Sequence, residues 1–561
     1  RIWNQNQSGT PPTGYYYGTE YTNAEEIITA KQDYAASHAT HVTGIAAGAY
    51  KGNEYYGIAP DADLVFVSYN VSDNSSSNTS ITDGIKYIYD YAESVGKPCV
   101  INMSLGYHIG PHDGTSTFDR ICDELQGEGR LLVGASGNEA EYNIHATKTL
   151  KKGDTNMKSL VEFVSNWYLY GSMTSTVDIW GDAEKQLSAR VFVYDILNKK
   201  EIYSSESFST TASASKKISN PTGADGNIYI STATNPYNKK GNITIDLNLS
   251  SFDNRNYYIG FEISGPEETT INAWTDAYMS WLSNFGNSEF TNGDNNSTMG
   301  EIGGTGKRII TVGAYTSCNY IDHKNSSMWN NSGQTLNQLV SFSSLGPTAD
   351  GRMKPDITAP GSMLISSFNS STSSNRNGED YNYVVKQENV NTVNYYYGSM
   401  EGTSMATPVV TGVLATWLQA NPKLTPEQVR EILSNTATTD SYTGNIAGVG
   451  NNRWGYGKIN AYDGLVYCLN HSGIEQIGTP TRPMVYPNPA TDICYFLLQN
   501  DDKNVNVSIY TLNGTEIYSR YMGNINAGEQ NQLDLSDLAA GIYFIHITGD
   551  KTNMTTKLTV K

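Results

Sequence analysis

GSMEGTSMATPVVTG, at residues 398–412, places a serine between a threonine and a methionine, with a proline four positions later. The residues after Ser404 are first small and then apolar, a pattern that predicts a helix. Ser404 is therefore expected at a helix N-terminus, where free N–H groups and the helix dipole favour developing negative charge. Pro408 is compatible with that position, because the first turn of a helix has no intrahelical donors to lose. A serine in a Gly/Thr turn is more often a helix cap than a nucleophile, so its role depends on its neighbours.

Strands and helices alternate on both sides of a long interruption. Residues 38–140 combine helical patterns such as HATHVTGIAAGAY with apolar strands such as PCVINMSLG, and ADLVFVSYN is expected to be a buried strand. The alternation resumes at GKRIITVGAY. Strands that alternate with helices in this way predict β-α-β units and a parallel sheet. Between the two parts, 141–300 shows alternating strand patterns with Gly and Asn turns. That texture predicts an antiparallel sandwich inserted into the α/β domain.

The chain length of 561 residues fits two to four domains. The expected fold class is α/β, a parallel sheet flanked by helices, with two added β-sandwiches. Residues 367–397, rich in Ser, Asn and Tyr, are expected to form a loop or a short hairpin. The expected parts are an α/β domain at 1–140 and 301–470, a jelly-roll-like sandwich at 141–300, a linker at 471–484 and a C-terminal β-sandwich at 485–561.

Composition excludes several classes of partner. The net charge of −19 argues against binding to nucleic acid or to an anionic membrane, since either needs a basic surface. No apolar run approaches 18 residues, so no membrane span is expected. The five cysteines are scattered without metal-ligand spacing, which predicts at most one disulfide. The chain opens on Arg1 without a basic-then-apolar segment, so any signal peptide is expected to have been removed.

Two further polar residues lie where they could assist Ser404. His38 begins a helix in SHATHVTGIAAG, which places its imidazole at the edge of the sheet. Asn138, in GASGNEA, follows the carboxyl end of a parallel strand, where ligands collect in open α/β sheets. A reacting serine needs a base for its proton and donors for its oxyanion, and an amide can be such a donor. Each residue alone is more often structural, but together they suggest nucleophilic catalysis.

These segments resemble the subtilisin-like serine peptidases (subtilases). SHATHVTG is similar to the histidine motif of that family, VINMSLG to its substrate-binding strand, VGASGNE to its oxyanion loop and GTSMATP to its nucleophile motif. The supporting blocks GIAPDADL, ITVGAY, SFSSLGP and KPDITAPG also match. The resemblance covers essentially all of 38–140 and 301–465, and it implies a subtilisin-like fold and serine endopeptidase activity on protein or peptide substrates.

The resemblance also implies a role for each matching residue. His38 would be the general base, Ser404 the nucleophile and Asn138 a donor to the oxyanion. His41, the second histidine of the motif, is interpreted as structural. Substrate-binding walls of the S1 pocket are implied at Ser104, Leu105 and Gly106, which would pair with the substrate backbone, and at Ala135, Ser136 and Gly137.

The aspartate of the triad is not found in its usual setting. Subtilases run Asp, His, Ser, with the aspartate in a D-[ST]-G setting that nothing before His38 resembles. Asp33 lies too near His38, and Asp356 lies in a block that the family uses structurally. The opening RIWNQNQSGTPPTGYYYGTEYT resembles the stretch after the aspartate in a clostridial spore-germination-type branch, which also carries a β-sandwich insertion. The catalytic Asp is therefore expected N-terminal to Arg1. It would lie on a processed fragment that stays docked by strand pairing or, alternatively, in preceding residues that this sequence does not include.

The C-terminal segment has a resemblance of its own. VYPNPATDICYF, VSIYTLNGTEIYS and LDLSDLAAGIYFIHITG resemble the type A sorting domain of the type IX secretion system. This resemblance implies export across the outer membrane of a Gram-negative bacterium, followed by release or surface attachment.

Two other functions stay open at this point. In the first, the chain is a pseudoprotease that keeps the fold for binding, with the missing carboxylate and Ala39, where the family has glycine, as its signs. In the second, the inserted sandwich binds carbohydrate or protein through Trp167, Trp180 and Trp274, although core packing is the favoured role of these rings. No cofactor is required by the peptidase chemistry, and the loop carboxylates leave room for structural calcium without placing it.

Overall fold

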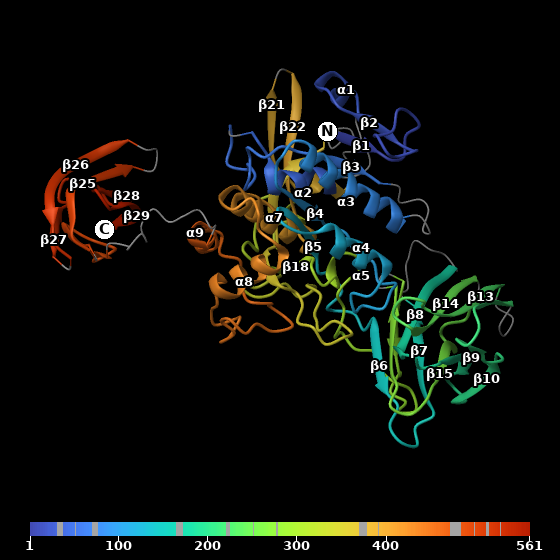
Figure 1. The fold of residues 1–561 in the computed structure, drawn as a ribbon. Helices are drawn as coiled ribbons and strands as arrows, with labels where there is room; N and C mark the ends of the chain where they lie inside the picture. Colours follow the sequence, from blue (N-terminus) through green and yellow to red (C-terminus); the bar gives the residue numbers. More distant parts are fainter. Residues whose placement is uncertain are drawn as a thin grey trace. The chain divides into compact units, whose positions relative to one another are not determined.

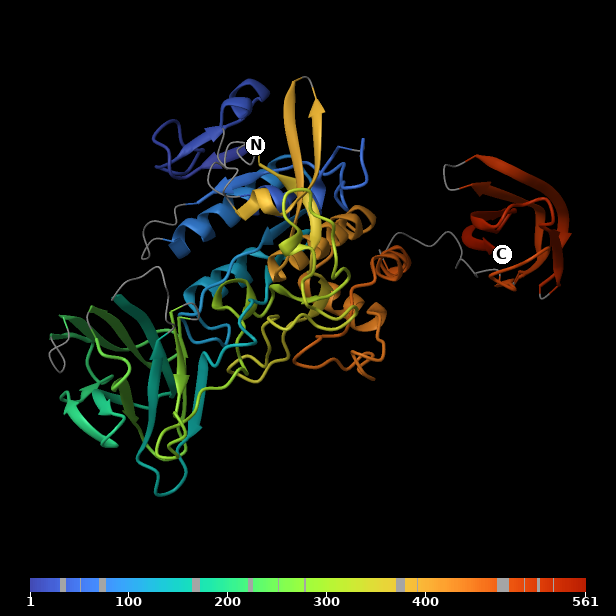
Figure 2. The ribbon, with the colours of Figure 1, turned by 180° about the vertical axis from the view of Figure 1, so that it is seen from behind.

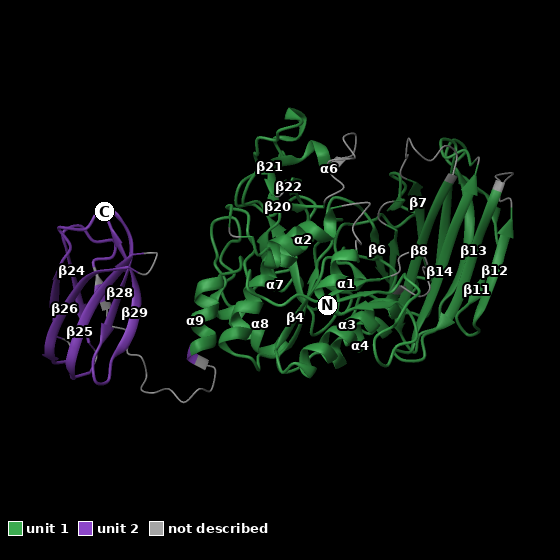
Figure 3. Ribbon diagram, turned by 90° about the horizontal axis from the view of Figure 1, so that it is seen from above, with its two compact units in different colours: residues 1–469 green, residues 470–561 purple. Residues whose placement is uncertain are grey.

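The computed structural model divides the chain into two compact units, residues 1–469 and residues 470–561 (Figure 3). The expected linker at 471–484 lies almost wholly outside the described residues, as does Trp167. The residues described are 1–30, 37–50, 52–69, 77–163, 172–219, 225–250, 252–276, 279–369, 379–390, 392–471, 484–498, 500–511, 515–527 and 529–561.

A four-stranded parallel sheet forms the centre of unit 1, in the order β19-β18-β5-β4 (Figure 1). Alternate residues of β5 point to opposite faces: Leu131 and Val133 pack against α7 and α8, whereas Leu132 packs against α3 and α4. Helices on both faces explain why these strands are continuously apolar. The elements are α3 (Ser77–Ser94), β4 (Cys99–Met103), α4 (Thr117–Leu125), β5 (Arg130–Ala135), β18 (Ile310–Tyr315), β19 (Ile357–Pro360), α7 (Thr403–Ala420), α8 (Pro426–Thr436) and α9 (Ala461–His471).

A second, small sheet lies at the N-terminal side, in the order β2-β1-β3. It comprises β1 (Ile2–Asn4), β2 (Thr19–Tyr21) and β3 (Phe66–Ser68), and β1 pairs with β3 in parallel. The strand expected in ADLVFVSYN is thus shorter than expected and not buried, because Phe66 is 39% exposed. Both β3 and β4 are edge strands of their sheets in the described part of the chain.

The segment after β5 forms two antiparallel sheets that enclose one apolar core. The sheet orders are β10-β9-β15-β7-β17, with β11 on β9, and β12-β13-β14-β8-β16-β6. Alternating residues of β14 are buried, and its Ile243 and Ile245 pack with Val177 and Phe261. The strands are β6 (His145–Thr149), β7 (Asn156–Phe163), β8 (Ser172–Ala183), β9 (Ser188–Asp195), β10 (Lys200–Ser204), β11 (Phe208–Ser209), β12 (Ala214–Ser219), β13 (Asp225–Thr234), β14 (Lys240–Ser250), β15 (Tyr257–Ser264), β16 (Thr270–Thr275) and β17 (Ser280–Ser283).

A β-hairpin leads directly to the segment of Ser404. β21 (Val384–Val390) and β22 (Val393–Met400) project from the domain, and β20 (Leu364–Phe368) pairs with β22 (Figure 2). Of the two forms expected for 367–397, a loop or a hairpin, the structure shows a hairpin. Residues 370–378 lie outside the described residues. The short helices of unit 1 are α1 (Ala24–Thr29), α2 (His38–Ala47), α5 (Glu301–Gly304) and α6 (Glu379–Asn382).

Unit 2 is an antiparallel β structure with its own core. One sheet has the order β26-β25-β28-β29 and the other β23-β24-β27. Val507, Ile545 and Phe496 are fully buried between them. The strands are β23 (Met484–Tyr486), β24 (Ile493–Leu497), β25 (Asp502–Thr511), β26 (Glu516–Ile525), β27 (Asn531–Asp534), β28 (Gly541–Thr548) and β29 (Asn553–Val560).

A buried ionic network joins β19 to α8. Asp356 accepts hydrogen bonds from Lys354 Nζ at 2.8 Å and from Arg430 Nε at 2.7 Å. Burial alone would raise the pKa of Asp356, but Arg430 and then Lys354 outweigh it and lower that pKa to about 2. Burial lowers the pKa of Lys354 to about 8. Both pKa values are thus lowered, which means that the surroundings favour the charged form of Asp356 and disfavour the charged form of Lys354. We assign the stabilising role to Asp356, because it faces two cations.

Replacing Asp356 by Asn should destabilise unit 1 by about 3–5 kcal/mol, because two buried cations would lose their counter-charge. Since the native pKa of about 2 lies below the ordinary value of about 3.9, this contribution is complete above about pH 4 and is lost as the pH falls toward 2. Chemical unfolding at several pH values measures both effects. Asp63→Asn, at an exposed pair with Lys97, is the matched control and should cost less than about 1 kcal/mol. Equal stability of Asp356→Asn and wild type at pH 7 would contradict this assignment.

Candidate active site

Ser404 is the second residue of α7, at the carboxyl end of the parallel sheet. The N-cap residue is Gly402, with φ of 148°, a backbone conformation that favours glycine. Gly402 has no side chain that could cap this helix end, so the N–H groups of the first turn depend on other acceptors. Ser404 is half-buried, whereas Thr403 and Met405 on either side are buried.

His38 is the first residue of α2 and is exposed, as is Ala39 beside it. One turn further, Val42 and Ile45 pack against Met405 of α7. This contact packs the middle of α2 against the first turn of α7, the turn that carries Ser404.

His41 is fully buried beneath this contact. Its Nε2 lies 3.0 Å from Leu364 O and 3.1 Å from Gly398 O, which ties α2 to β20 and β22. Burial lowers the pKa of His41 to about 4, so the ring is neutral at ordinary pH. His41 therefore positions α2 and has no access to a substrate.

Asn138 follows β5 and is held by the residue before the nucleophile. The backbone N–H of Thr403 donates to Asn138 Oδ1 at 2.9 Å, and the Thr403 hydroxyl donates to the same atom at 3.0 Å. Because two donors occupy Oδ1, the amide orientation is set and Nδ2 is the atom that Asn138 can offer to a ligand. A methyl group on Gly402 would lie 3.6 Å from that Nδ2. The amide donor therefore lies beside the N-terminus of α7.

The segment after β4 is connected to the same helix. Ser104 Oγ donates to Ser404 O at 2.7 Å, and Asn102 Nδ2 donates to Ser104 Oγ at 3.1 Å. The segment after β5 is connected in the same way, since Gly137 N donates to Thr403 Oγ1 at 3.3 Å. The two predicted pocket walls are thus both anchored on the first turn of α7. They comprise Ser104, Leu105 and Gly106 after β4, and Ala135, Ser136 and Gly137 at the end of β5.

A third segment bridges the two walls, and the sequence analysis did not identify it. Gly300 N donates to Ser136 O at 3.0 Å, and Glu301 N donates to Tyr107 O at 2.6 Å. The inserted strands separate this segment from the walls in the chain, so no local motif signals it. This segment, here called the base, is therefore hydrogen-bonded to both walls.

Glu139 is a second group that sequence analysis missed. Its Oε2 accepts the backbone N–H of Asn138 at 2.6 Å and the hydroxyl of Ser344 at 2.9 Å. Burial would raise the pKa of Glu139, but His108 and the hydrogen bonds outweigh it and lower that pKa. Glu139 is therefore a buried carboxylate next to the amide donor.

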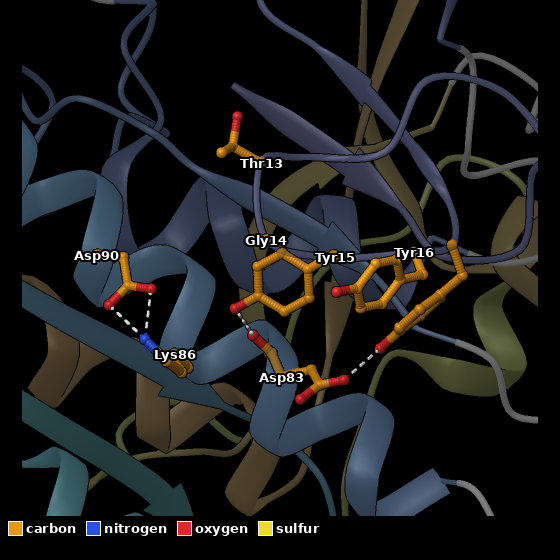
Figure 4. A pocket seen from close by; sticks show the side chains of 8 residues that line it. Thr13, Gly14, Tyr15, Tyr16, Asp83, Lys86 and Asp90 are labelled. Carbon is orange, nitrogen blue, oxygen red and sulfur yellow. Dashed lines mark hydrogen bonds and ion pairs between the residues drawn. The ribbon is translucent and has the colours of Figure 1, made fainter.

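A pocket of about 330 Å³ lies elsewhere, between the N-terminal segment and α3 (Figure 4). Tyr17 OH donates to Asp83 Oδ2 at 2.7 Å, and Tyr15 OH donates to the backbone oxygen of Asp83 at 3.2 Å. None of the predicted site residues lines it. The lining residues are Thr13, Gly14, Tyr15, Tyr16, Tyr17, Asp83, Lys86 and Asp90.

The structure also describes tryptophans and cysteines for which the sequence suggested a role, and it bears on the expectations for metal-binding groups and membrane-spanning helices. Trp180 and Trp274 are buried in the inserted sheets, so their faces are not available to a sugar. All five cysteines are free. In the described part of the chain, no three His, Cys, Asp or Glu side chains are arranged to hold a metal ion, and structural calcium stays a prediction. No described helix is long and apolar enough to cross a membrane.

Comparison with known proteins identifies two families. A model of the subtilase family matches residues 14–256 and 205–457, and a model of the secretion system C-terminal sorting domain matches 484–561. The sorting domain directs the chain through the type IX secretion system to the cell surface or the extracellular space.

Individual relatives match over part of their length. Serine protease AprX of Bacillus subtilis (strain 168) is 36% identical over 158 residues, which is 28% of this chain and 30% of that protein. Subtilisin of Bacillus sp. (strain TA39) is 35% identical over 126 residues, 22% of this chain and 28% of that protein. The chain thus spans about 30% of the length of these relatives. The CspB protease of Clostridium perfringens shares the fold with a TM-score of 0.57 and 19% identity, over 80% of this chain and 84% of that one.

Two glycines of the walls differ in the space around them, which provides a direct test of this geometry. Gly137 has φ of 110°, and a Cβ there would lie 2.4 Å from Glu139 Oε2, whereas a Cβ on Gly106 would meet no atom within 4 Å. Gly137→Ala should therefore lower stability by about 2 kcal/mol or more, through strain and displacement of Glu139. Gly106→Ala, the matched control, should change stability by less than about 0.5 kcal/mol. Thermal unfolding measures both, and equal effects would contradict the arrangement described.

Proposed function

Because the chain belongs to the subtilase family, we propose that it is a serine endopeptidase that works through an acyl-enzyme. Ser404 Oγ attacks the scissile carbonyl while His38 takes its proton, and His38 then protonates the departing amine. Asn138 Nδ2 and the Ser404 N–H donate to the oxyanion of the tetrahedral intermediate. Water hydrolyses the resulting ester with the same two residues. Protein groups carry every step, so the chemistry requires no cofactor.

One observation carries this proposal above the others. Thr403 saturates Asn138 Oδ1 and so directs Nδ2 to the helix end where Ser404 lies. A turn-forming Asn would need no such orientation, whereas an oxyanion donor needs it before the substrate arrives. The relatives named as proteases support the same activity.

We assign peptide binding to the two walls beside Ser404. An extended substrate backbone would add as a strand along Ser104, Leu105 and Gly106, with its side chain toward the base formed by Gly300 and Glu301. Because the sorting domain exports the chain, the substrates are proteins or peptides outside the cell or at its surface.

Subtilases run Asp, His, Ser, and we propose that the aspartate of this triad contacts His38 from an additional strand. β3 and β4 each present an unpaired strand edge in the described part of the chain. A parallel strand on β4 would end at the same sheet edge as Ser104 and Asn138, since the carboxyl ends of parallel strands meet there. The aspartate at its end would come from a segment N-terminal to Arg1 that stays docked after processing.

Replacement of Ser404 by Ala should reduce hydrolysis of a fluorogenic peptide on the order of 10⁴-fold or more, because the nucleophile is lost. Labelling of the native preparation by a fluorophosphonate should disappear in the same variant. Ser341→Ala, at an exposed serine, is the control and should retain labelling. A native protein that is neither labelled nor active would instead be a pseudoprotease that uses the fold for binding.

The additional strand predicts a companion peptide in the native, active preparation. Intact-mass measurement should find a peptide that contains an aspartate, and hydrogen exchange should find the outer amides of residues 99–103 protected. Separation of the peptide under denaturing conditions and refolding of the chain alone should expose these amides and lower kcat on the order of 10⁴-fold. Full activity of a preparation that contains residues 1–561 alone would refute the docked strand.

A further inference from the structure

The inserted strands reach the oxyanion loop through a buried stack of rings. We propose that Trp274, His112 and His108 form a column that ends on Glu139 and thereby holds Asn138 in position. His108 is then a positioning residue for the reaction, and the insertion is part of the catalytic apparatus. The proposal rests on the function proposed above.

The column ends at a carboxylate that holds the donor residue. Glu139 Oε2 accepts the Asn138 backbone N–H at 2.6 Å, and Glu139 itself is buried. A buried carboxylate is costly unless a polar or cationic group faces it. His108 Nε2 faces this carboxylate at 3.3 Å, and the His108 side chain is 7% exposed. The Ser344 hydroxyl also donates to Glu139 Oε2, at 2.9 Å, so His108 is the ring and Ser344 the hydroxyl that hold this carboxylate. The position of Asn138 therefore depends on Glu139 and, through it, on His108.

His108 uses its Nε2 for the contact with Glu139. Its Nδ1 is buried and makes no hydrogen bond in the described part of the chain. The contact with Glu139 uses Nε2 as the donor, because a carboxylate oxygen can only accept. His108 follows the Gly106 wall by two residues, so it connects the substrate wall with the oxyanion loop.

His112 lies against His108 and orients it. The two rings are nearly parallel, with centroids 6.1 Å apart and an interplanar angle of 13°. His112 Nε2 lies 3.0 Å from His108 O, and its Nδ1 lies 2.9 Å from Met299 O. The backbone N–H of His112 donates to Glu301 at 2.8 Å. Burial lowers the pKa of His112 to about 3, so the ring is neutral and its one N–H donates to one of these two carbonyl oxygens. That hydrogen bond and the backbone contact with Glu301 hold the residue in place.

Trp274 of β16 completes the column from the insertion. Its ring stacks on His112 with centroids 4.2 Å apart and an angle of 16°, and no part of Trp274 is exposed. Trp274 Nε1 donates to Ser297 O at 3.0 Å, which fixes the indole plane. His145 of β6 lies 4.9 Å from the same ring. Two strands of the insertion thus support the His112 ring.

Other contacts attach the same loop to the insertion. Asp178 of β8 accepts the backbone N–H of Gly110 at 2.8 Å, and Lys240 of β14 pairs with Asp113 at 2.6 Å. The loop from Gly106 to Asp113 is therefore held from the insertion at three places. A loop bound so extensively cannot move without the sheets that bind it.

The expected consequence is specific to the transition state. An oxyanion donor acts mainly on the transition state, so a small displacement of Asn138 lowers kcat and kcat/KM together and leaves KM nearly unchanged. A variant that merely loosens the fold would lower the amount of active protein and the unfolding temperature without this pattern. The two cases are therefore separable by kinetics.

The test uses the native full-length preparation and a fluorogenic peptide. His108→Ala should lower kcat about 30-fold with KM changed less than about twofold, because Asn138 loses its support while substrate binding persists. His108→Gln, which keeps a donor toward Glu139, should recover most of that loss. Trp274→Leu should lower kcat with the same pattern, and Trp274→Phe, which keeps a flat ring, should be milder.

Trp281→Leu is the matched control, since Trp281 lies in β17 of the same insertion and stacks on Tyr142 at 5.4 Å. It makes the same chemical change outside the column and should leave kcat unchanged. Equal losses of kcat in Trp274→Leu and Trp281→Leu would overturn the proposal, as would His108→Ala with unchanged kcat. Concentrations of folded protein are matched by thermal unfolding and circular dichroism.

A second readout does not depend on activity. Hydrogen exchange at the Asn138 amide, which is bonded to Glu139, should accelerate at least tenfold in His108→Ala and in Trp274→Leu and stay unchanged in Trp281→Leu. If the wild-type protein hydrolyses no peptide, the proposed peptidase function fails, yet this exchange still tests the column. Unchanged exchange in both column variants would overturn the column even in an active enzyme.

Discussion

The hydrogen bonds from Thr403 to Asn138 are the contact on which the arrangement of the site depends. They join residues separated by 265 positions in the chain, the start of α7 and the end of β5. Neither partner is free to adjust, because β5 is packed on both faces and α7 is buried along most of its length. The amide therefore keeps its orientation without a substrate, which is the condition for electrostatic stabilisation of a transition state.

Further hydrogen bonds connect the neighbouring segments to the same end of α7 or to the hairpin before it. His41 ties α2 to the hairpin that leads to Ser404, and Ser104 ties the segment after β4 to the first turn of α7. Each tie is a side chain bonded to backbone, which fixes the position of a segment more firmly than a surface ion pair would. Glu139 is the one charged group in this set, and its burial makes the site dependent on whatever faces its carboxylate.

The sequence was most informative where a motif is local. The helix after Ser404, the strands around Ile101 and Val133 and the buried state of Trp274 follow from short patterns of apolar and small residues. The base of the pocket at Gly300 and the column through His108 could not be predicted, because their partners come from segments separated by the whole insertion. The strand expected around Phe66 is short and exposed, since burial depends on a neighbouring strand and not on its own composition.

Three features are still expectations that rest on chemistry: the orienting carboxylate, the S1 preference and the part that calcium plays. The first follows from the Asp, His, Ser order of subtilases and from the edge of β4, which is unpaired among the described residues. We expect the second to depend on the base at Gly300 and Glu301, which follows the inserted strands in the chain. The insertion therefore deserves study as part of the site.

The central claim is that Ser404, His38 and Asn138 act on one carbonyl carbon. A crystal structure of the native protein with a peptide boronic acid tests it most directly, since boron mimics the tetrahedral intermediate. The account predicts a bond from Ser404 Oγ to boron, with one boronate oxygen about 2.7–3.1 Å from Asn138 Nδ2 and from the Ser404 N–H. An unmodified Ser404, or a boronate oxygen directed away from Asn138, would contradict it.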